Sequence, residues 1–469
     1  MGDLKGGKPN GKLFYLDQFG CAKNQVDGEL LIGQLENSGL RLTEDPSEAL
    51  LIIINSCGFI ESAKTESIEA VMTARRDFPQ AKILLAGCLA ERYAEQLLSD
   101  LPEADGFFGN GDLSRITGTV EALFSGERCS VISPQEGVCC GERPMLLSFP
   151  GSAYVKITEG CDNRCTFCAI PLIRGSLRSR SPEDIINEIR TLLNRGVYEI
   201  NLIGPDLASY GRDVLNGTRT VLSPALSPLA ELLSRISAMD GNFIVRLLYI
   251  HPDNFPRDIL PVIRQDRRIL SYFDIPFQHG DDGILKAMNR RGTAAGYLDL
   301  AAEIRRELPD AVVRTTFMTG FPGETQEAFE HTAEFLRELE ADWSGCFAYS
   351  REDDTPAGEM KKQVPRRTAG ARKTELETVQ SRITEAKLKK YVGQQFDVLI
   401  EEIIRGGEDS FTLGRCWFQA PEVDGAVVMQ YENPEQEGGA QSLRTLSPGM
   451  VVRALITGVS GVDLEAVPV

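Results

Sequence analysis

The sequence predicts an α/β protein of three parts: a parallel α/β domain, a TIM-like parallel (β/α) barrel and a small antiparallel β-barrel of OB type. Two observations predict this order. Apolar strands alternate with amphipathic helices through the first two parts, which is typical of parallel sheets. From about Phe396 short strands follow one another with Gly and Pro turns, which indicates a small barrel. The 469 residues are enough for roughly three domains.

The first domain is expected at residues 11–127. Its strands are expected at residues 13–21, 49–57 and 82–88, with helices at 27–38, 62–77 and 90–98. These strands end in Cys21, Cys57 and Cys88. Because the carboxyl ends of parallel strands share one edge of a sheet, the three thiols should lie close together. Small buried cysteines also end strands for packing reasons alone, but three in the same topological position favour a metal site.

A joining segment is expected at residues 128–150. It contains two adjacent cysteines in a polar stretch, which we interpret as an incidental loop feature. The remaining cysteines share neither the strand-end arrangement nor the spacing of a metal-binding loop. We therefore expect five cysteines to bind no metal: Cys129, Cys139, Cys140, Cys346 and Cys416.

The parallel barrel, complete or open, with a connecting helix at its end, is expected at residues 151–390. Its strands are expected at residues 153–158, 199–204, 243–250, 272–277, 312–321 and 343–350. Chemistry in such barrels lies at the carboxyl ends of the strands. Asp206, His251, His279 and the turn Gly320–Glu324 follow such ends. Each histidine either faces the cavity or holds a loop, and the turn either contacts a ligand or begins a helix.

The first barrel strand leads into Cys161, Cys165 and Cys168, a C-x3-C-x2-C spacing. Thiolates at this spacing can hold an iron–sulfur cube, and three thiolates leave one of its four irons open to a small molecule. The alternatives are a structural zinc site, which prefers four closed ligands, and three unrelated thiols. Phe167 stands where an aromatic ring can cover a cluster or stack on a ligand. Phe167 and Asp206 are the candidate cofactor-binding residues.

The chain ends in a long charged helix, residues 365–394, and the small barrel, residues 391–469. We interpret the helix as a solvated connector. The barrel segment has 12 acidic residues, four arginines and no lysine, a net charge of −8. Because a nucleic-acid groove needs positive charge, this composition favours a basic protein partner. The acidic positions expected to face that partner are Glu401, Glu402, Glu408, Asp409, Glu422 and Asp424.

The composition indicates in which cellular compartment the protein is expected. The formal net charge is −18, with eleven cysteines and three histidines. No apolar run is long enough for a transmembrane helix, and the first residues lack the apolar core of a signal peptide. We therefore expect a cytoplasmic protein with reduced, metal-binding thiols and no membrane partner.

The order of the three parts resembles the methylthiotransferase family of radical S-adenosylmethionine enzymes, over about residues 11–469. The cysteine loop matches the C-x3-C-x-aromatic-C motif of that superfamily, and the last module resembles the TRAM domain. Four segments resemble the branch that modifies ribosomal protein S-twelve: Phe19–Glu29, Cys165–Arg180, Ile275–Gly292 and Ala420–Gly425. Gly28 and Pro205 depart from that branch, which usually has serine and glutamine there. The methionine–asparagine pair and the C-x2-C-I-V-P-Y run of the tRNA branch are not present in the sequence.

The resemblance implies two 4Fe–4S clusters, one that binds S-adenosylmethionine and one auxiliary. The ligands it implies are Cys161, Cys165 and Cys168 for the first, and Cys21, Cys57 and Cys88 for the second. The implied reaction adds sulfur and methyl to the β-carbon of one aspartate of S-twelve. One S-adenosylmethionine would methylate a sulfur on the auxiliary cluster, and a second would yield the radical that removes hydrogen. A low-potential electron donor is then required.

Two other functions remain as alternatives. A tRNA adenosine methylthiotransferase is disfavoured by the acidic barrel, so tRNA is not the expected partner. A non-catalytic iron–sulfur carrier leaves the full barrel and the open coordination sites unexplained. No side chain is assigned as a proton-transfer catalyst, since the chemistry belongs largely to the cofactors.

Overall fold

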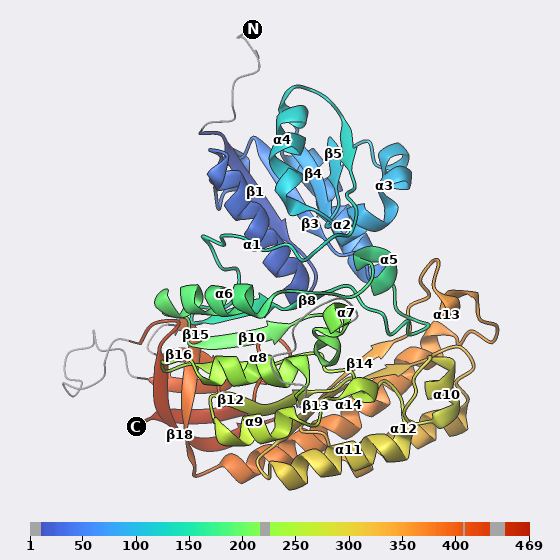
Figure 1. Cartoon of the computed structure of the whole chain (residues 1–469), viewed down its shortest axis with the longest axis vertical. Coiled ribbons are helices and arrows are strands. Elements are labelled where there is room, and N and C mark those ends of the chain that lie inside the picture. The colour runs from blue at the N-terminus through green and yellow to red at the C-terminus, as the bar shows by residue number, and fades with distance from the viewer. Residues whose placement is uncertain (1–10, 216–225, 407–408, 432–445) are drawn as a thin grey trace.

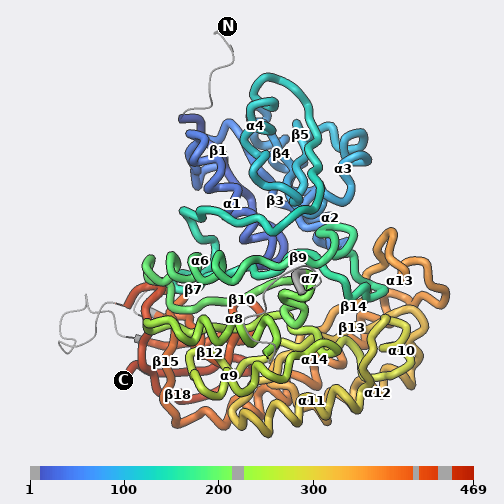
Figure 2. Tube along the Cα trace, viewed as in Figure 1, coloured from blue at the N-terminus to red at the C-terminus, as the bar shows by residue number. Residues whose placement is uncertain are grey.

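The computed structural model describes residues 11–215, 226–406, 409–431 and 446–469. The N-terminal α/β domain lies at the top of Figure 1, the central sheet and its helices lie below it, and the C-terminal barrel lies at the lower left. The continuous tube in Figure 2 shows the chain entering the central part from the first domain and finishing in the barrel. The predicted fold class is confirmed for all three parts.

The N-terminal domain is a parallel sheet flanked by helices. Its strands are hydrogen-bonded in the order β2-β1-β3-β4-β5-β6. The predicted apolar strands correspond to β1, β3 and β4, and the last two are almost wholly buried. Strand β6 lies inside the segment expected to join the domains. The elements are β1 (Leu13–Gln18), α1 (Ala22–Asn37), β2 (Arg41–Leu42), β3 (Leu51–Ser56), α2 (Glu61–Asp77), β4 (Lys82–Gly87), α3 (Cys88–Asp100), β5 (Gly106–Phe108), α4 (Ile116–Phe124) and β6 (Cys129–Val131).

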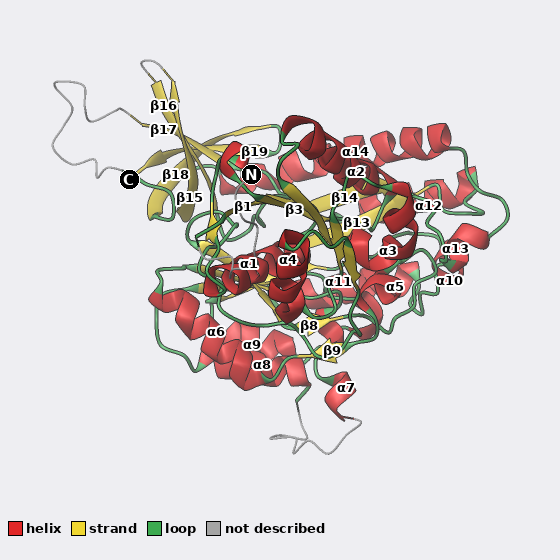
Figure 3. Ribbon diagram, turned by 90° about the horizontal axis from the view of Figure 1, so that it is seen from above, coloured by secondary structure: helices red, strands yellow, loops and turns green. Residues whose placement is uncertain are grey.

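The central part is an open parallel sheet in the order β14-β13-β12-β11-β10-β7. Figure 3 shows helices on the outer side of these strands. All the expected barrel strands are present. They are β7 (Ser152–Lys156), β10 (Glu199–Ile203), β11 (Ile244–Leu247), β12 (Ile269–Asp274), β13 (Val312–Thr319) and β14 (Trp343–Ala348), with a small ribbon of β8 (Thr158–Glu159) and β9 (Arg178–Ser179).

The helices of the central part separate its strands, as the alternating pattern predicts. Helix α6 begins at the expected cap, where Asp184 N donates to Ser181 Oγ at 3.1 Å. The helices are α5 (Ile170–Arg174), α6 (Pro182–Asn194), α7 (Arg212–Leu215), α8 (Pro228–Ser237), α9 (Ile259–Gln265), α10 (Asp282–Ala287), α11 (Ala294–Glu307), α12 (Gln326–Leu339), α13 (Pro356–Glu359) and α14 (Arg366–Leu388).

Helix α14 corrects the interpretation of residues 365–394 as a solvated connector. Its buried positions Ala369, Leu376, Gln380 and Thr384 recur at helical spacing and pack against β13, β14 and α12. Gln380 Nε2 donates to the carbonyl of Ala341 at 2.9 Å. Polar residues on this buried face donate hydrogen bonds to backbone carbonyls at the end of a strand. Because these residues are polar, the sequence pattern wrongly indicated a solvent-exposed helix.

The C-terminal part is a closed barrel in the order β15-β16-β17-β19-β18. Its pairs are antiparallel as predicted, except that β17 and β19 run parallel. The strands are β15 (Gln395–Gly406), β16 (Asp409–Arg415), β17 (Val427–Tyr431), β18 (Val451–Ser460) and β19 (Asp463–Pro468).

The three parts share apolar packing. One continuous cluster of buried side chains includes Phe14 of the first sheet, Tyr154 and Trp343 of the central strands, and Val398 and Phe418 of the barrel segment. In the described ranges no helix has both the length and the apolar character needed to cross a bilayer.

Candidate active site

Three cysteine-bearing loops meet at the carboxyl edge of the N-terminal sheet. Cys21 precedes α1, Cys57 follows β3, and Cys88 begins α3. A Cβ atom on Gly20 would lie 3.1 Å from the Cys57 Cβ, and one on Gly58 would lie 2.7 Å from the Cys88 carbonyl oxygen. The structure therefore brings these strand ends into direct contact, as parallel topology predicts.

Two of these cysteines follow a glycine that turns the chain out of its strand. Gly20 and Gly87 have φ angles of +89° and +90°, which residues with a Cβ atom rarely adopt. At Gly87 an added Cβ would also lie 2.6 Å from Asn55 Oδ1. The sharp turns at these two positions depend on glycine.

The Asn24 side chain ties the three loops together. Its Nδ2 donates to the carbonyls of Phe19, Asn55 and Ser56 at 2.8, 3.1 and 3.2 Å. Its Oδ1 lies 3.8 Å from Cys88 Sγ. Asn24 is 1% exposed. Sequence reasoning missed this residue, because only its place near the first cysteine marks it.

Electrostatics also couples these thiols. Burial, and then the neighbouring Cys88 thiolate, raise the pKa of Cys57 to about 12. Burial raises the pKa of Cys88, although the Arg174 cation opposes it. Desolvation also acts on Cys21, but the Lys23 and Arg174 cations bring the pKa of Cys21 below its ordinary value.

The second cysteine group lies on the loop between β8 and α5. Thr166, in the middle of this loop, donates its backbone N–H to the Met288 carbonyl at 3.2 Å. Burial raises the pKa of Cys161 to about 11. Burial, and then the Cys165 thiolate, raise the pKa of Cys168 to about 12. The loop thus holds three mutually coupled thiols next to the end of α10.

His251 lies against this second group. Its Nε2 is 3.8 Å from Cys165 Sγ and accepts a hydrogen bond from Arg290 Nη1 at 2.6 Å. Burial, and then the Arg290 cation, lower the pKa of His251 to about 4. The imidazole is therefore neutral at pH 7. His251 lines the pocket, and its Nδ1 also accepts from Asp253 N at 3.3 Å, so its ring both faces the cavity and holds the turn that follows.

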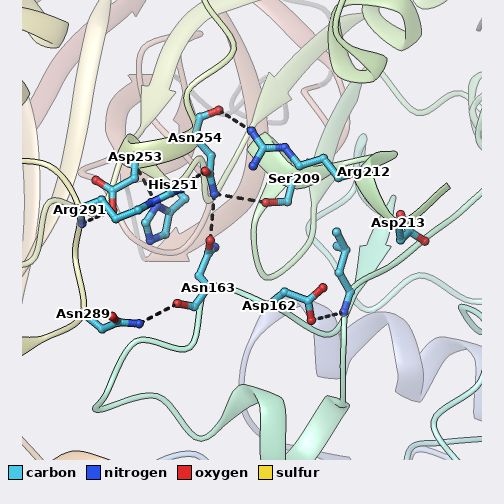
Figure 4. Close-up of a pocket in the computed structure, with 11 residues that line it drawn as sticks. Asp162, Asn163, Ser209, Arg212, Asp213, His251, Asp253, Asn254, Asn289 and Arg291 are labelled. Atoms are coloured by element: carbon cyan, nitrogen blue, oxygen red, sulfur yellow. Dashed lines mark hydrogen bonds between the residues drawn. The ribbon is translucent and has the colours of Figure 1, made fainter. Parts of the chain in front are cut away.

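A pocket of about 380 Å³ opens beside the cysteine loop at the carboxyl ends of the strands. Figure 4 shows Asn163, from the cysteine loop, pointing into it and bonded to Asn254 and Asn289. Carboxylates, amides and guanidiniums dominate its wall. The lining residues are Asp162, Asn163, Leu177, Ser209, Arg212, Asp213, His251, Asp253, Asn254, Asn289 and Arg291.

Asp206 is 1% exposed, and protein donors surround its carboxylate. It accepts from Ala208 N at 2.9 Å, Ser209 Oγ at 2.6 Å, Asn163 Nδ2 at 2.8 Å and His251 N at 3.1 Å. These contacts hold the cysteine loop and the His251 turn in place. The geometry supports a positioning role for Asp206.

Phe167 is half-buried and packs against the small apolar cluster that includes Met288, Phe321 and Ala357. Its ring therefore helps to fix the cysteine loop on the surface formed by α10 and the loop after β13. Contact of Phe167 with a cluster or ligand stays a prediction.

His279 and the turn Gly320–Glu324 hold loops. His279 is fully buried, with Nε2 3.2 Å from Glu324 Oε1. Glu324 also accepts from the backbone N–H of Gly320 and from Arg372 Nη1 of α14. This network anchors α14 to the sheet, which favours the structural interpretation of both features.

A buried ionic network joins the two cysteine groups. Arg174, at the end of α5, donates to Glu159 Oε1 at 3.0 Å and to Asp27 Oδ2 at 2.8 Å. The same guanidinium donates to Cys88 Sγ at 3.3 Å. Lys156 of β7 pairs with both carboxylates. The central part thus contacts the first cysteine group directly, which no sequence pattern indicated.

The C-terminal barrel packs against the opposite, amino-terminal ends of the central strands. Tyr272 donates its hydroxyl to Asp424 Oδ2 at 2.6 Å, and Arg314 Nε lies 3.4 Å from Asp424 Oδ1. Glu401 pairs with Arg415 at 2.5 Å. Asp424 and Glu401 are therefore largely buried, and the expectation that they face a partner is wrong.

The other acidic positions of the barrel differ in exposure. Glu402 and Glu422 are exposed, and Glu422 also accepts from the Tyr154 hydroxyl at 3.3 Å. Glu408 and the side chain of Asp409 lie outside the described residues.

Both cysteine groups fit a cluster by their donor chemistry. Each offers three thiols, without a disulfide, at one sheet edge. Among the described residues no three side chains of His, Cys, Asp or Glu already surround a common point as metal ligands, so position and electrostatic coupling identify the groups. Since the pKa values of Cys57, Cys88, Cys161 and Cys168 are raised, cluster binding at these thiols must release protons.

Comparison with known families divides the chain in the same way as the structure. Residues 13–109 match the model described as uncharacterized protein family UPF0004, residues 155–336 match the radical SAM superfamily, and residues 392–469 match the TRAM domain. The radical SAM methyltransferase TsrM from Kitasatospora setae has a similar fold, with a TM-score of 0.55 over 74% of this chain and 75% of that one, at 16% identity.

Curated relatives are similar over nearly their whole length. The ribosomal protein uS12 methylthiotransferase RimO of Treponema denticola is 52% identical over 97% of this chain and 100% of that protein. RimO of Symbiobacterium thermophilum is 38% identical over 95% of this chain and 88% of that protein. With three matching domains and two cysteine groups at neighbouring strand ends, the chain belongs to the RimO family of radical SAM ribosomal protein uS12 methylthiotransferases.

Proposed function

We propose that this enzyme adds a methylthio group to the β-carbon of one aspartate of ribosomal protein uS12. One observation carries the proposal: two groups of three cysteines lie at adjoining strand edges and are joined by the Arg174–Cys88 contact. Two separate sites fit a reaction that needs both a radical source and a sulfur donor. The proposed ligands are Cys161, Cys165 and Cys168 for one 4Fe–4S cluster and Cys21, Cys57 and Cys88 for the other.

The bound clusters and S-adenosylmethionine would supply the hydrogen-abstracting radical and the methylated sulfur. The residues of the chain would hold the clusters and S-adenosylmethionine in place and exclude water. Asp206 fixes the loop that carries the second cysteine group, and Asn24 fixes the first. The polar pocket next to the loop supports binding of the charged groups of S-adenosylmethionine, with Phe167 covering the cluster.

The partner would meet the exposed acids of the barrel. A ribosomal protein is basic, and the barrel segment carries a net charge of −8. We also propose a low-potential electron donor, a cytoplasmic setting for the free thiols, and domain limits at residues 127, 150 and 390. The tRNA alternative is not favoured, because the two relatives described above are uS12 enzymes.

Mass spectrometry tests the proposal. The full chain, reconstituted with iron and sulfide and supplied with S-adenosylmethionine and a reductant, should give uS12 a mass gain of one methylthio group. A uS12 variant with asparagine at the target should gain nothing. Unmodified uS12 together with methylthiolated tRNA adenosine would instead establish the alternative.

A further inference from the structure

Among the residues that the structure describes, the ammonium group of Lys23 is buried between the two cysteine groups without a carboxylate partner. Lys23 is 7% exposed. Its Nζ lies 3.7 Å from the centre of the Tyr249 ring. Among the described residues it has no hydrogen bond and no carboxylate within ion-pair distance.

The neighbours of Lys23 show that its ammonium group lies where the two cysteine groups meet. Lys23 is two residues after Cys21, on the first turn of α1. Tyr249 is two residues before His251, whose ring touches Cys165. The Lys23–Tyr249 contact therefore spans from the first cysteine group to the second.

Other buried cations nearby are compensated. Lys156 has two carboxylates, Asp27 and Glu159, and Arg174 shares them. Burying a charge without a partner costs free energy, and an aromatic face offsets only part of that cost. The positive charge of Lys23 is therefore placed where a bound anion would offset the cost of its burial.

The backbone of Tyr249 supports a functional constraint at this place. Its φ angle of +69° is unusual for a residue with a bulky side chain. Its N–H donates to Asp274 Oδ2 at 3.1 Å, and its carbonyl accepts from Leu207 N at 3.0 Å. The surrounding structure thus holds the ring, and the ammonium above it, in one position.

We propose that Lys23 binds the side-chain carboxylate of the target aspartate of uS12. The inference rests on the proposed function and names a residue that recognises the substrate. The β-carbon of aspartate is bonded to its carboxylate carbon, so a carboxylate held on Lys23 Nζ keeps the β-carbon between the two cysteine groups. The competing explanation is that Lys23 only balances negative charge at Cys21.

The test compares two substrates and two lysines. Full-length reconstituted enzyme binds purified uS12 and a uS12 variant with asparagine at the target position. The wild-type enzyme should bind the aspartate form about tenfold more tightly, since hydrogen bonds to charged groups are among the stronger ones. Lys23→Met should bring the ratio of dissociation constants to about one, and Lys23→Arg should retain part of the preference.

Lys12→Met is the matched control. Lys12 Nζ lies 3.8 Å from the Phe124 ring centre, so it has the same kind of contact away from the cysteine groups. This variant should keep the tenfold preference. Iron content and visible absorption should be those of the wild type in both methionine variants.

Three outcomes oppose the inference. An unchanged preference in Lys23→Met excludes the carboxylate contact. Loss of iron, or an altered cluster spectrum, in Lys23→Met assigns the lysine to the cluster instead. A wild-type enzyme that binds neither form of uS12 overturns the proposed function, and the inference with it.

Discussion

The guanidinium of Arg174 donates to the sulfur of Cys88 across the boundary between two domains, with Nη2 3.3 Å from Sγ. Arg174 belongs to the helix after the second cysteine group, and Cys88 belongs to the first group. The same side chain binds Asp27 and Glu159. One arginine therefore sets the relative position of the two groups.

Replacing Arg174 by methionine should destabilise the protein strongly. The change leaves Asp27 and Glu159 partly uncompensated in a buried site, which costs on the order of 3–5 kcal/mol. Urea unfolding measures the loss. Arg76→Met removes an exposed pair with Asp77 and should change the midpoint little. Equal stability of the two variants would contradict the role given to Arg174.

The two cysteine groups should hold iron independently. Alanine at Cys161, Cys165 and Cys168 should leave about half the iron and abolish S-adenosylmethionine cleavage, as expected for two equal cubes. Alanine at the other three should also leave about half, with cleavage retained and transfer lost. Full iron in either triple variant would refute that ligand set.

The remaining cysteines provide the control for this experiment. Their combined replacement by serine should preserve both the iron content and the visible absorption. Cys346 and Cys416 are buried in the apolar packing of the central part and of the barrel. The loss of one whole cluster would show that a ligand had been missed. The replaced residues are Cys129, Cys139, Cys140, Cys346 and Cys416.

Asn24 should be needed for the auxiliary cluster only. Asn24→Ala removes the side-chain donor that links the carbonyls of Phe19, Asn55 and Ser56, and with it the hydrogen bonds that hold these loops together. We expect the iron content to fall toward half, while S-adenosylmethionine cleavage persists. Asn37→Ala, at the exposed end of the same helix, is the control. Wild-type iron in Asn24→Ala would show that the loops assemble without it.

The contact between the C-terminal barrel and the central sheet, made by Arg415 and Glu199, should weaken at acidic pH. Burial opposes ionisation of Glu199, but the Arg415 and Arg246 cations hold its pKa well below its ordinary value of 4.5. A lowered folded pKa gives stability that is fully present above 4.5 and lost as the pH falls below it. Glu199→Gln should therefore be less stable than the wild type near pH 7, and the difference should shrink toward about pH 3. Urea midpoints of iron-free protein measure this, and a difference independent of pH would contradict it.

Exposed acids of the barrel, and not the buried ones, should steer uS12. Glu402 and Glu465 are exposed, so changing both to lysine should slow association, with a smaller effect at high salt because charges are screened. Cleavage of S-adenosylmethionine should persist. Asp424→Asn should lower stability instead, since Asp424 holds Tyr272. Stopped-flow measurement of uS12 association at two salt concentrations tests this prediction. An association rate that changes neither with salt nor with the two lysine substitutions would contradict an electrostatic role of the barrel.

The sequence by itself determined the three parts, the strand order along the chain and the six strand-end or loop cysteines. These follow from local properties: apolar strands recur between amphipathic helices, and parallel connections force strand ends to one edge. The cysteine spacing of the central loop is likewise local. The three domains matched by family comparison begin close to the predicted elements.

Only the tertiary structure decided which polar residues are buried. On α1, Lys23 and Asp27 are buried against the central part, although the composition of this helix is that of an exposed one. Helix α14 and Asp424 show the same effect at other boundaries. The physical reason is that a buried charge depends on a partner far away in sequence, and local pattern carries no information about that partner.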